Sequence, residues 1–440
     1  MYHILDTLAK ENFEQVFLGF RNFFLLYCEG MLLSFYHSLI QRGILSPDFS
    51  KRCAYACFAL IPLYFVLWGQ GIVNSIGAPY PTKDVLCDFK AFYTAGQLAA
   101  EGTPALAYDY GAHKQKQRLL EGEGSTAPYI QFPYPPYFLA FSELLATLDY
   151  LPALVLWQLG SLALAMLAMY RIFPLRETVL IALAAPVYIA NFAHGQTAFL
   201  TAALIGLFLV NLEKRPLLAG VFAGLLAYKF QFGLLIPVAL IMGGYGKTFL
   251  SAAATVGMMT LGVTALYGPD IWPSFFHNVV NQMRYFEGSD QQLEMIHSLF
   301  SFVHHTMGAP KGLGYAVQGV IQVGVLGCIL WLWRKNNPVP YALKAAALAS
   351  GALLMTPYLM DYDLFVLLPA LVFIGRYQKD FGVVPYGKTI PILLWVMCAF
   401  ARQLYGITTI PFGFLTLLAT FGFVMVLAKQ ALDNRMQAHP

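Results

Sequence analysis

The chain has 440 residues, of which 58% are hydrophobic and only 11% are charged, and its net charge is +4. Soluble domains carry about a quarter charged residues, so the composition excludes a water-soluble fold and indicates a helical protein with many membrane spans. The modest positive charge does not require a nucleic-acid partner. Six scattered cysteines without a CxxC pair predict neither a disulfide framework nor a zinc site.

The N-terminal residues 1–50 carry an apolar stretch that Arg21, Glu29 and His37 interrupt. A charge at the centre of a span costs about 3 kcal/mol, so we expect this segment to lie in the membrane interface as an amphipathic helix. The alternative is that part of it crosses the membrane. A basic stretch followed by a small-residue cleavage site is missing, so no cleaved signal peptide is expected.

An integral membrane domain is predicted over residues 51–430, and its first span runs from Cys53 to Val73. Together with this first span, the apolar segments predict about twelve transmembrane helices. The later segments lie near 151–170, 177–192, 198–212, 216–228, 231–244, 248–267, 312–333, 341–356, 361–376, 389–405 and 410–428. The segments 216–228 and 231–244 are too short to cross a core of about 30 Å, which favours a pocket where they meet.

The basic residues lie in alternate connections between the predicted spans. If the N-terminus is cytoplasmic, the outer connections contain only isolated basic residues, such as Lys229 and Arg402. The positive-inside rule then places the loop at 74–136 outside and the tail at 431–440 in the cytoplasm. The inner connections contain Lys51, Arg52, Arg171, Arg176, Lys214, Arg215, Lys247, Arg334, Lys335, Arg376, Lys379, Lys388 and Lys429.

The polar loop at 74–136 is the main exception to the apolar pattern, and long ordered loops commonly carry functional sites. Asp88 precedes a helical run from Phe89 to Ala100, so its carboxylate can act as a general base or cap that helix. Tyr134-Pro135-Pro136 ends the loop, and its restricted backbone favours a structural role in holding the loop on the membrane domain. The acidic residues of the loop are Asp84, Asp88, Glu101, Asp109, Glu121 and Glu123.

Several other polar side chains are predicted on the same outer side. Lys229 and Gln231 separate two short apolar segments, where a lysine is costly unless it pairs with an anion or reaches the headgroups. A lipid phosphate is a natural anion for it. His194 and Gln196 precede a helix that begins near Thr197, and they either cap the turn or bind a phosphate or sugar.

A second group of outer polar residues comes late in the chain. His297 follows a loop that contains Arg284, and it either complements a phosphate or has a structural role. Asp361 and Asp363 stand at the start of a late span, where helix capping and ion pairing are favoured over orienting an acceptor sugar. HExxH, phosphate-loop, GxSxG and dinucleotide motifs are missing from the sequence.

Several segments, in this order, resemble glycosyltransferase family 87, a group of polytopic type C (GT-C) enzymes. They are DFKAFYTAGQLAAEGTPALAYDY, QFPYPPYFLAFSELLATLDYLP, GQTAFLTAAL, RPLLAGVFAGLLAYKFQFGLLIPVALI and TPYLMDYDLFVLLPAL, and they extend from residue 88 to about 370. One departure is Phe230, which stands where family members commonly have proline. The resemblance implies an all-α GT-C bundle in a bacterial inner membrane, with a large first loop and the active site at the outer face.

The resemblance also implies an activity, which is inverting transfer of a hexose, such as mannose, from a polyprenyl-phosphate donor to a lipid or glycan acceptor. Asp88 matches the aspartate expected to be the general base. Lys229, His297 and Arg284 are the expected contacts of the donor phosphate. The expected acceptor or sugar contacts are Tyr93, Tyr134, His194, Gln196, Gln231, Asp361 and Asp363.

No metal is expected, because the leaving group is a lipid with a single phosphate and no carboxylate cluster is evident, and no cofactor or nucleic-acid partner is expected either. Two alternatives stay open. A transporter or flippase of lipid-linked saccharides is also polytopic, but it should carry charged residues in mid-span. A non-catalytic membrane scaffold would tolerate the loss of both Asp88 and Lys229.

Overall fold

The computed structural model describes residues 74–75, 80–81, 87–122, 125–185, 187–288 and 295–438. The predicted interfacial segment and the predicted first span lie outside these residues. The described part is helical, apart from one isolated bridge between Ile296 and Met360. The expected all-α class is therefore confirmed.

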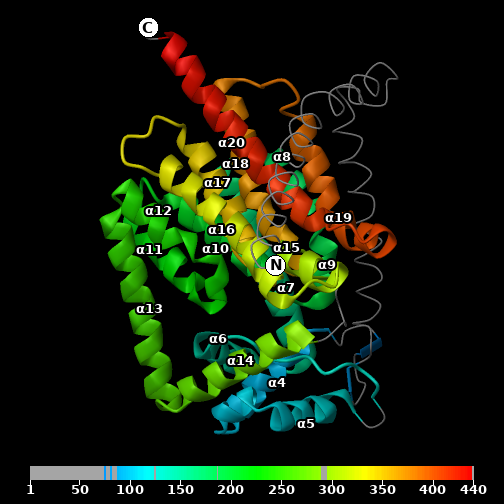
Figure 1. Cartoon of the computed structure of the whole chain (residues 1–440). Helices are drawn as coiled ribbons and strands as arrows, with labels where there is room; N and C mark the ends of the chain where they lie inside the picture. The colour runs from blue at the N-terminus through cyan, green and yellow to red at the C-terminus, as the bar shows by residue number, and fades with distance from the viewer. Residues whose placement is uncertain are drawn as a thin grey trace, which may run out of the picture. The chain divides into compact units, whose positions relative to one another are not determined.

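The polar loop and a later segment form a set of helices that we call the loop layer (Figure 1). Here α4 packs against α6, α5 and η2, while α14 packs against η2 and α6. The Asp109 side chain accepts from Ala112 N at 2.8 Å and caps α5, and Pro136 starts α6 because its missing N–H is not needed there. The bounds are α4 Phe89–Ala100, η2 Pro104–Tyr108, α5 Tyr110–Glu121, α6 Pro136–Leu145 and α14 Ile271–Gly288.

Five described helices are long and apolar enough to cross a membrane, and the bent pair α8 and α9 makes a sixth span if the two are counted together. The protein is therefore a multi-pass membrane protein, while the count of twelve spans stays a prediction. These helices are α7 Tyr150–Ile172, α8 Arg176–Leu183, α9 Tyr188–His194, α13 Gly246–Tyr267, α16 Lys311–Leu332, α19 Thr389–Thr408 and α20 Phe412–Ala438.

Shorter helices occupy the centre of the bundle. Almost every residue of α10 and α17 is buried, and the many alanines of α17 allow α16, α18 and α20 to approach closely. The shorter elements are α10 Ala198–Asn211, α11 Pro216–Leu225, η3 Leu226–Phe232, α12 Leu235–Gly243, α15 Leu299–Ser301, the π-helical turn η5 Phe302–Thr306, α17 Tyr341–Leu354, η6 Asp361–Leu367 and α18 Leu368–Phe381.

The predicted basic connections meet one another in the fold. The backbone N–H of Lys335 donates to the Met242 carbonyl at 2.9 Å, and Arg376 donates to the Ile172 carbonyl at 3.2 Å. The helix ends that carry them lie away from the loop layer (Figure 1). The bundle therefore has a basic end and an end that faces the loop layer.

Candidate active site

Asp88 stands directly before α4, but its side chain does not cap that helix. In the described first turn of α4, no backbone N–H donates to the carboxylate. Instead, Gln196 Nε2 donates to Asp88 Oδ2 at 3.0 Å, and His194 Nδ1 lies 3.6 Å from the same oxygen. The carboxylate side chain is 19% exposed. The geometry therefore disfavours the capping interpretation and leaves the carboxylate accessible to a ligand.

Gly195 brings these partners to Asp88. Its φ of +66° lies in the left-handed region, and a Cβ there would come 2.6 Å from Cys87 Sγ and 2.9 Å from Phe89 Cβ. Trp157 Nε1 donates to the Gly195 carbonyl at 2.9 Å and holds the turn from the side of α7. Only glycine allows the turn between α9 and α10 to lie this close to the start of α4.

Tyr134 supports Gln196 from the loop layer. Its hydroxyl donates to Gln196 Oε1 at 3.0 Å, and Tyr108 OH donates to the Tyr134 carbonyl at 3.0 Å. The amide oxygen of Gln196 is thereby occupied, and its NH₂ group faces Asp88. The prediction that the Tyr134-Pro135-Pro136 motif fixes the loop to the membrane helices is confirmed.

A line of charged and titratable groups continues from Asp88. His194 Nε2 lies 3.9 Å from Asp361 Oδ2, and Arg402 donates to the same oxygen at 3.2 Å. Asp361 Oδ1 accepts from the backbone N–H of Tyr362 at 2.8 Å. One cluster therefore contains Asp88, from just before α4, together with His194 of α9, Asp361 of η6 and Arg402 of α19.

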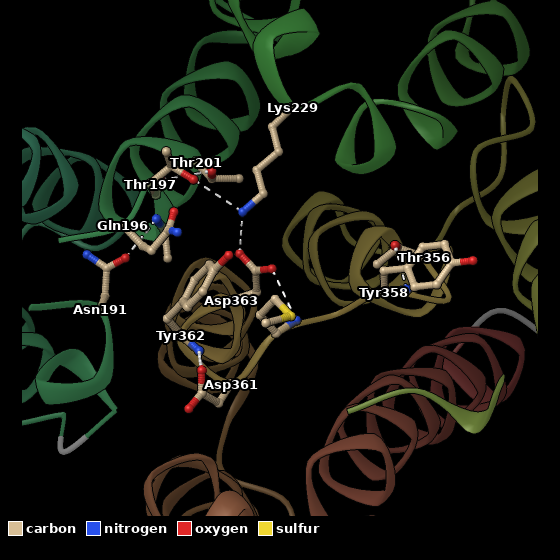
Figure 2. A network of polar contacts seen from close by, with 12 residues as sticks. Asn191, Gln196, Thr197, Thr201, Lys229, Thr356, Tyr358, Asp361, Tyr362 and Asp363 are labelled. Carbon is tan, nitrogen blue, oxygen red and sulfur yellow. Dashed lines mark hydrogen bonds and ion pairs between the residues drawn. The ribbon is translucent and has the colours of Figure 1, made fainter. Parts of the chain in front are cut away.

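Lys229 lies at a break in η3, where its φ of −134° and ψ of 62° interrupt the helical turn. Figure 2 shows its side chain pointing to Asp363 and Thr197. The ammonium is 2.5 Å from Asp363 Oδ1 and 3.2 Å from Thr197 Oγ1, and the two charged side chains are 5% and 2% exposed. Asp363 Oδ2 also accepts from Met360 N at 3.3 Å. The prediction of capping and ion pairing at Asp361 and Asp363 is confirmed.

The ring of His297 lies beside this cluster. Its backbone N–H donates to the Leu359 carbonyl at 2.7 Å, but neither ring nitrogen has a hydrogen bond among the described residues. Burial, together with the positive charge of nearby Arg402, lowers the pKa of the imidazole to about 4. The ring is therefore neutral near pH 7.

Residues 132–357, just over half of the chain, match the model of glycosyltransferase family 87. The chain belongs to glycosyltransferase family 87. No curated protein and no solved structure matches the chain. The protein is thus a membrane glycosyltransferase, an enzyme that moves a sugar from a donor to an acceptor. The matched range contains His194, Gln196, Lys229 and His297.

Three of the residues expected in this glycosyltransferase site lie apart from the cluster. The Tyr93 hydroxyl donates to the Leu148 carbonyl at 2.9 Å. Gln231 is half-buried and Arg284 is exposed on α14, and neither side chain has a hydrogen bond or ion pair among the described residues. Their roles at the donor or acceptor stay predictions.

A cavity of about 1130 Å³ in this enzyme lies along α4, α5 and α7, and it does not include the break at Lys229. Tyr93, Lys116 and Tyr150 line it, whereas Asp88, His194 and Lys229 do not. We therefore assign the candidate site to the cluster of charged side chains and not to the cavity. In the described ranges, no group of three or more His, Cys, Asp or Glu side chains could hold a metal ion.

Arg402 is the main site residue that sequence reasoning missed. An arginine within an otherwise apolar segment is a recognisable signal, because such residues are costly in membranes and commonly functional. The sequence shows Arg402 as an isolated outer base, but nothing local indicates its contact with Asp361. Thr197 was also missed, because a single threonine at a helix start carries no distinctive pattern.

Proposed function

We propose that this family 87 glycosyltransferase moves a hexose, such as mannose, from a polyprenyl-phosphate donor to a hydroxyl of a lipid or glycan acceptor. The observation that carries the proposal is the Asp88 carboxylate, which is partly exposed, does not cap α4 and lies where the loop layer meets the membrane helices. A donor with a lipid anchor fits a site among apolar helices, because the anchor can stay in the bilayer while the sugar reaches Asp88.

The reaction is a single displacement. Asp88 accepts the proton of the acceptor hydroxyl while that oxygen attacks the anomeric carbon of the donor sugar. The bond from the anomeric carbon to the phosphate oxygen breaks, and its electron pair leaves with the lipid phosphate. Attack opposite the leaving group inverts the anomeric centre. His194 and Gln196 hold the carboxylate in place for this proton transfer.

The site faces the outer side of a bacterial inner membrane in this proposal. This orientation is supported by the distribution of charge in the bundle. Basic residues concentrate in cytoplasmic connections, and the basic end lies away from the end that carries Asp88. Both termini then lie in the cytoplasm. Transport of a lipid-linked saccharide was the alternative function, and no contact in the described part of the chain specifically favours it.

The Asp88→Asn variant tests the proposed base. General-base catalysis typically contributes about 10²- to 10⁴-fold, so kcat for transfer from a radiolabelled polyprenyl-phosphate hexose should fall by about that factor while the protein stays folded. Asp109→Asn is the matched control. It removes the same charge from the same loop, and asparagine still caps α5, so transfer should stay normal.

Near-normal turnover by a folded Asp88→Asn protein would rule out Asp88 as the base. Release of lipid phosphate should accompany each sugar transferred. Movement of the lipid-linked sugar across a vesicle membrane without that release would contradict the glycosyltransferase proposal and favour a flippase.

A further inference from the structure

The departing lipid phosphate gains negative charge during the proposed reaction, so the site needs hydrogen-bond donors or a cation beside it. Lys229 was the expected cation, but its contacts are already made. Its ammonium faces Asp363 and Thr197 and lies 5.1 Å from the ring centres of Phe232 and Tyr362. An ammonium has three N–H groups, and these neighbours surround it.

Arg402 differs from Lys229 in its exposure and in the number of N–H donors that it uses. Among the described residues its guanidinium makes one hydrogen bond, to Asp361 Oδ2 at 3.2 Å, and its side chain is 40% exposed. A guanidinium has five N–H donors in a planar fork that matches the oxygens of a phosphate. Arg402 therefore keeps accessible donors for an anion, whereas the Lys229 ammonium is buried among its two hydrogen-bond partners and two aromatic rings.

His297 provides a second, independent observation. It is 1% exposed, and both ring nitrogens lack a hydrogen-bond partner among the described residues. A buried polar group without a partner is costly, so such a group commonly meets a ligand or water. The ring packs against Gly413, where a Cβ would collide with the imidazole. Glycine at this position thus makes room for an imidazole whose ring nitrogens have no hydrogen bond among the described residues.

Asp361 links Arg402 to the proposed base, and the positive charge of Arg402 in turn acts on His297. Its Oδ2 contacts both Arg402 and His194, and His194 contacts Asp88. An inverting displacement places the base and the leaving group on opposite sides of the sugar carbon. A continuous line of contacts with Asp88 at one end and Arg402 at the other fits that requirement.

We propose that Arg402 and His297 bind the phosphate of the lipid donor, and that Lys229 is a positioning residue that holds three interrupted spans together. This inference rests on the proposed function. As the anomeric carbon–oxygen bond breaks, its electron pair moves to the phosphate oxygen that Arg402 contacts, and the acceptor proton moves to Asp88. Neutral His297 donates one N–H to the same phosphate.

Binding of farnesyl phosphate to the full-length protein in detergent tests the subsite by calorimetry, with farnesol as the uncharged probe and inorganic phosphate as the probe without a lipid. Arg402→Gln and His297→Leu should each weaken farnesyl phosphate binding by about tenfold or more and leave farnesol binding unchanged. Inorganic phosphate should bind much more weakly than farnesyl phosphate. Equal binding of both anions would contradict a lipid-phosphate subsite.

Arg376→Gln is the matched control for Arg402. Arg376 is 41% exposed at the basic end of the bundle, where it donates to the Ile172 carbonyl and lies 3.9 Å from the Asp380 carboxylate, so it resembles Arg402 in exposure and in having one acidic partner among the described residues. Its replacement should leave binding and transfer unchanged. His297→Leu should keep or raise the unfolding temperature, because no hydrogen bond is lost, and this result separates lost binding from lost folding.

The paired variant Lys229→Met with Asp363→Asn removes both buried charges, and it should keep farnesyl phosphate binding within about threefold if it folds. A folded paired variant that loses binding, or an Arg402→Gln protein that binds normally, would overturn the inference. Asp88→Asn should bind farnesyl phosphate as the unchanged protein does. The binding assay thus tests the subsite, and the transfer assay tests the base.

Discussion

Two buried polar side chains anchor α4, the helix that follows Asp88. Lys90 is 1% exposed, and its ammonium lies 2.6 Å from both Glu121 Oε1 and the Pro128 carbonyl. His113 is fully buried, with Nε2 at 3.1 Å from the Ala91 carbonyl and Nδ1 at 3.0 Å from the Tyr129 hydroxyl. A carbonyl only accepts, so Nε2 carries the proton and Nδ1 accepts. Both residues hold other parts of the loop layer onto α4, the helix that positions the proposed base.

The burial of His113 makes the loop layer sensitive to acid. Burial lowers the pKa of this imidazole from 6.5 to about 4, so the unfolded chain binds a proton in this pH window and the folded chain does not. Stability should therefore fall as pH decreases from about 6.5 to 4, by an amount on the order of 3 kcal/mol. The contribution of His113 to this pH dependence is measured by thermal unfolding of the unchanged protein and of His113→Gln at pH 7 and pH 4.5.

The difference in unfolding temperature between the two proteins should shrink at pH 4.5, because glutamine does not titrate. The other histidines and the carboxylates are common to both proteins and cancel in the comparison. An unchanged difference would show that His113 takes up no extra proton on unfolding.

At the scale of elements, the site is built from helical segments that are interrupted near one another. The turn between α9 and α10, the break at Lys229 and the start of η6 meet through the contacts of Lys229 with Thr197 and Asp363 (Figure 2). Backbone groups at such breaks need polar partners in a membrane. Asn191 Oδ1 accepts from Ala198 N at 2.9 Å, and Tyr228 OH donates to the Thr197 carbonyl at 3.2 Å. Buried polar side chains thus replace the helical hydrogen bonds that the interruption removes.

Gly195→Ala tests whether this turn positions Asp88. The positive φ and the collision with Cys87 Sγ and Phe89 Cβ would force the turn and α4 apart. We expect kcat to fall by about tenfold or more, because small misplacements of catalytic groups are costly, together with a lower unfolding temperature. Sugar transfer and thermal unfolding are the measurements.

Gly257→Ala in α13 is the control for this change. Among the described residues, no atom outside the neighbouring backbone of α13 lies within 4 Å of its added Cβ, so this change should leave transfer unchanged and stabilise the helix by up to about 1 kcal/mol. Normal transfer by Gly195→Ala would show that the turn between α9 and α10 does not set the position of Asp88.

At the scale of the whole molecule, charge separates the two ends of the bundle. Contacts such as Lys335 with Met242 and Arg376 with Ile172 join the basic connections, whereas the site residues lie at the end next to the loop layer. Positive charge is retained on the cytoplasmic side, so this asymmetry predicts which end faces out. In the proposed function, Asp88 then meets an acceptor from the outer side and Arg402 meets a lipid donor from the bilayer.

Single cysteines in a protein without its native cysteines test this orientation. Glu101→Cys in the loop layer should react with a membrane-impermeant thiol reagent in intact cells, and Lys335→Cys should react only after the membrane is made permeable. Both positions are exposed, so access to the reagent depends on the side of the membrane. The reverse labelling pattern would contradict the proposed outer site.

The sequence by itself determined the helical membrane class, most apolar segments, the position of the polar loop and the resemblance to glycosyltransferase family 87. Hydropathy, helical runs and charge bias are properties of short segments, so they can be read without knowing which segments touch. Asp88, His194 and Gln196 were candidates for the same reason, because each stands at the start or end of a recognisable apolar or helical run.

Only the tertiary structure decided which of these side chains act on one another. Lys229 and Asp363 are 134 positions apart, and Asp361 and Arg402 are 41 positions apart. A pattern in the local sequence therefore does not predict either ion pair. Packing of α10, η3, η6 and α19 brings these charges together and neutralises Lys229 while leaving Arg402 half-exposed. Burial and pairing determine which cation can still bind an anion, and both depend on contacts between segments that are distant in the chain.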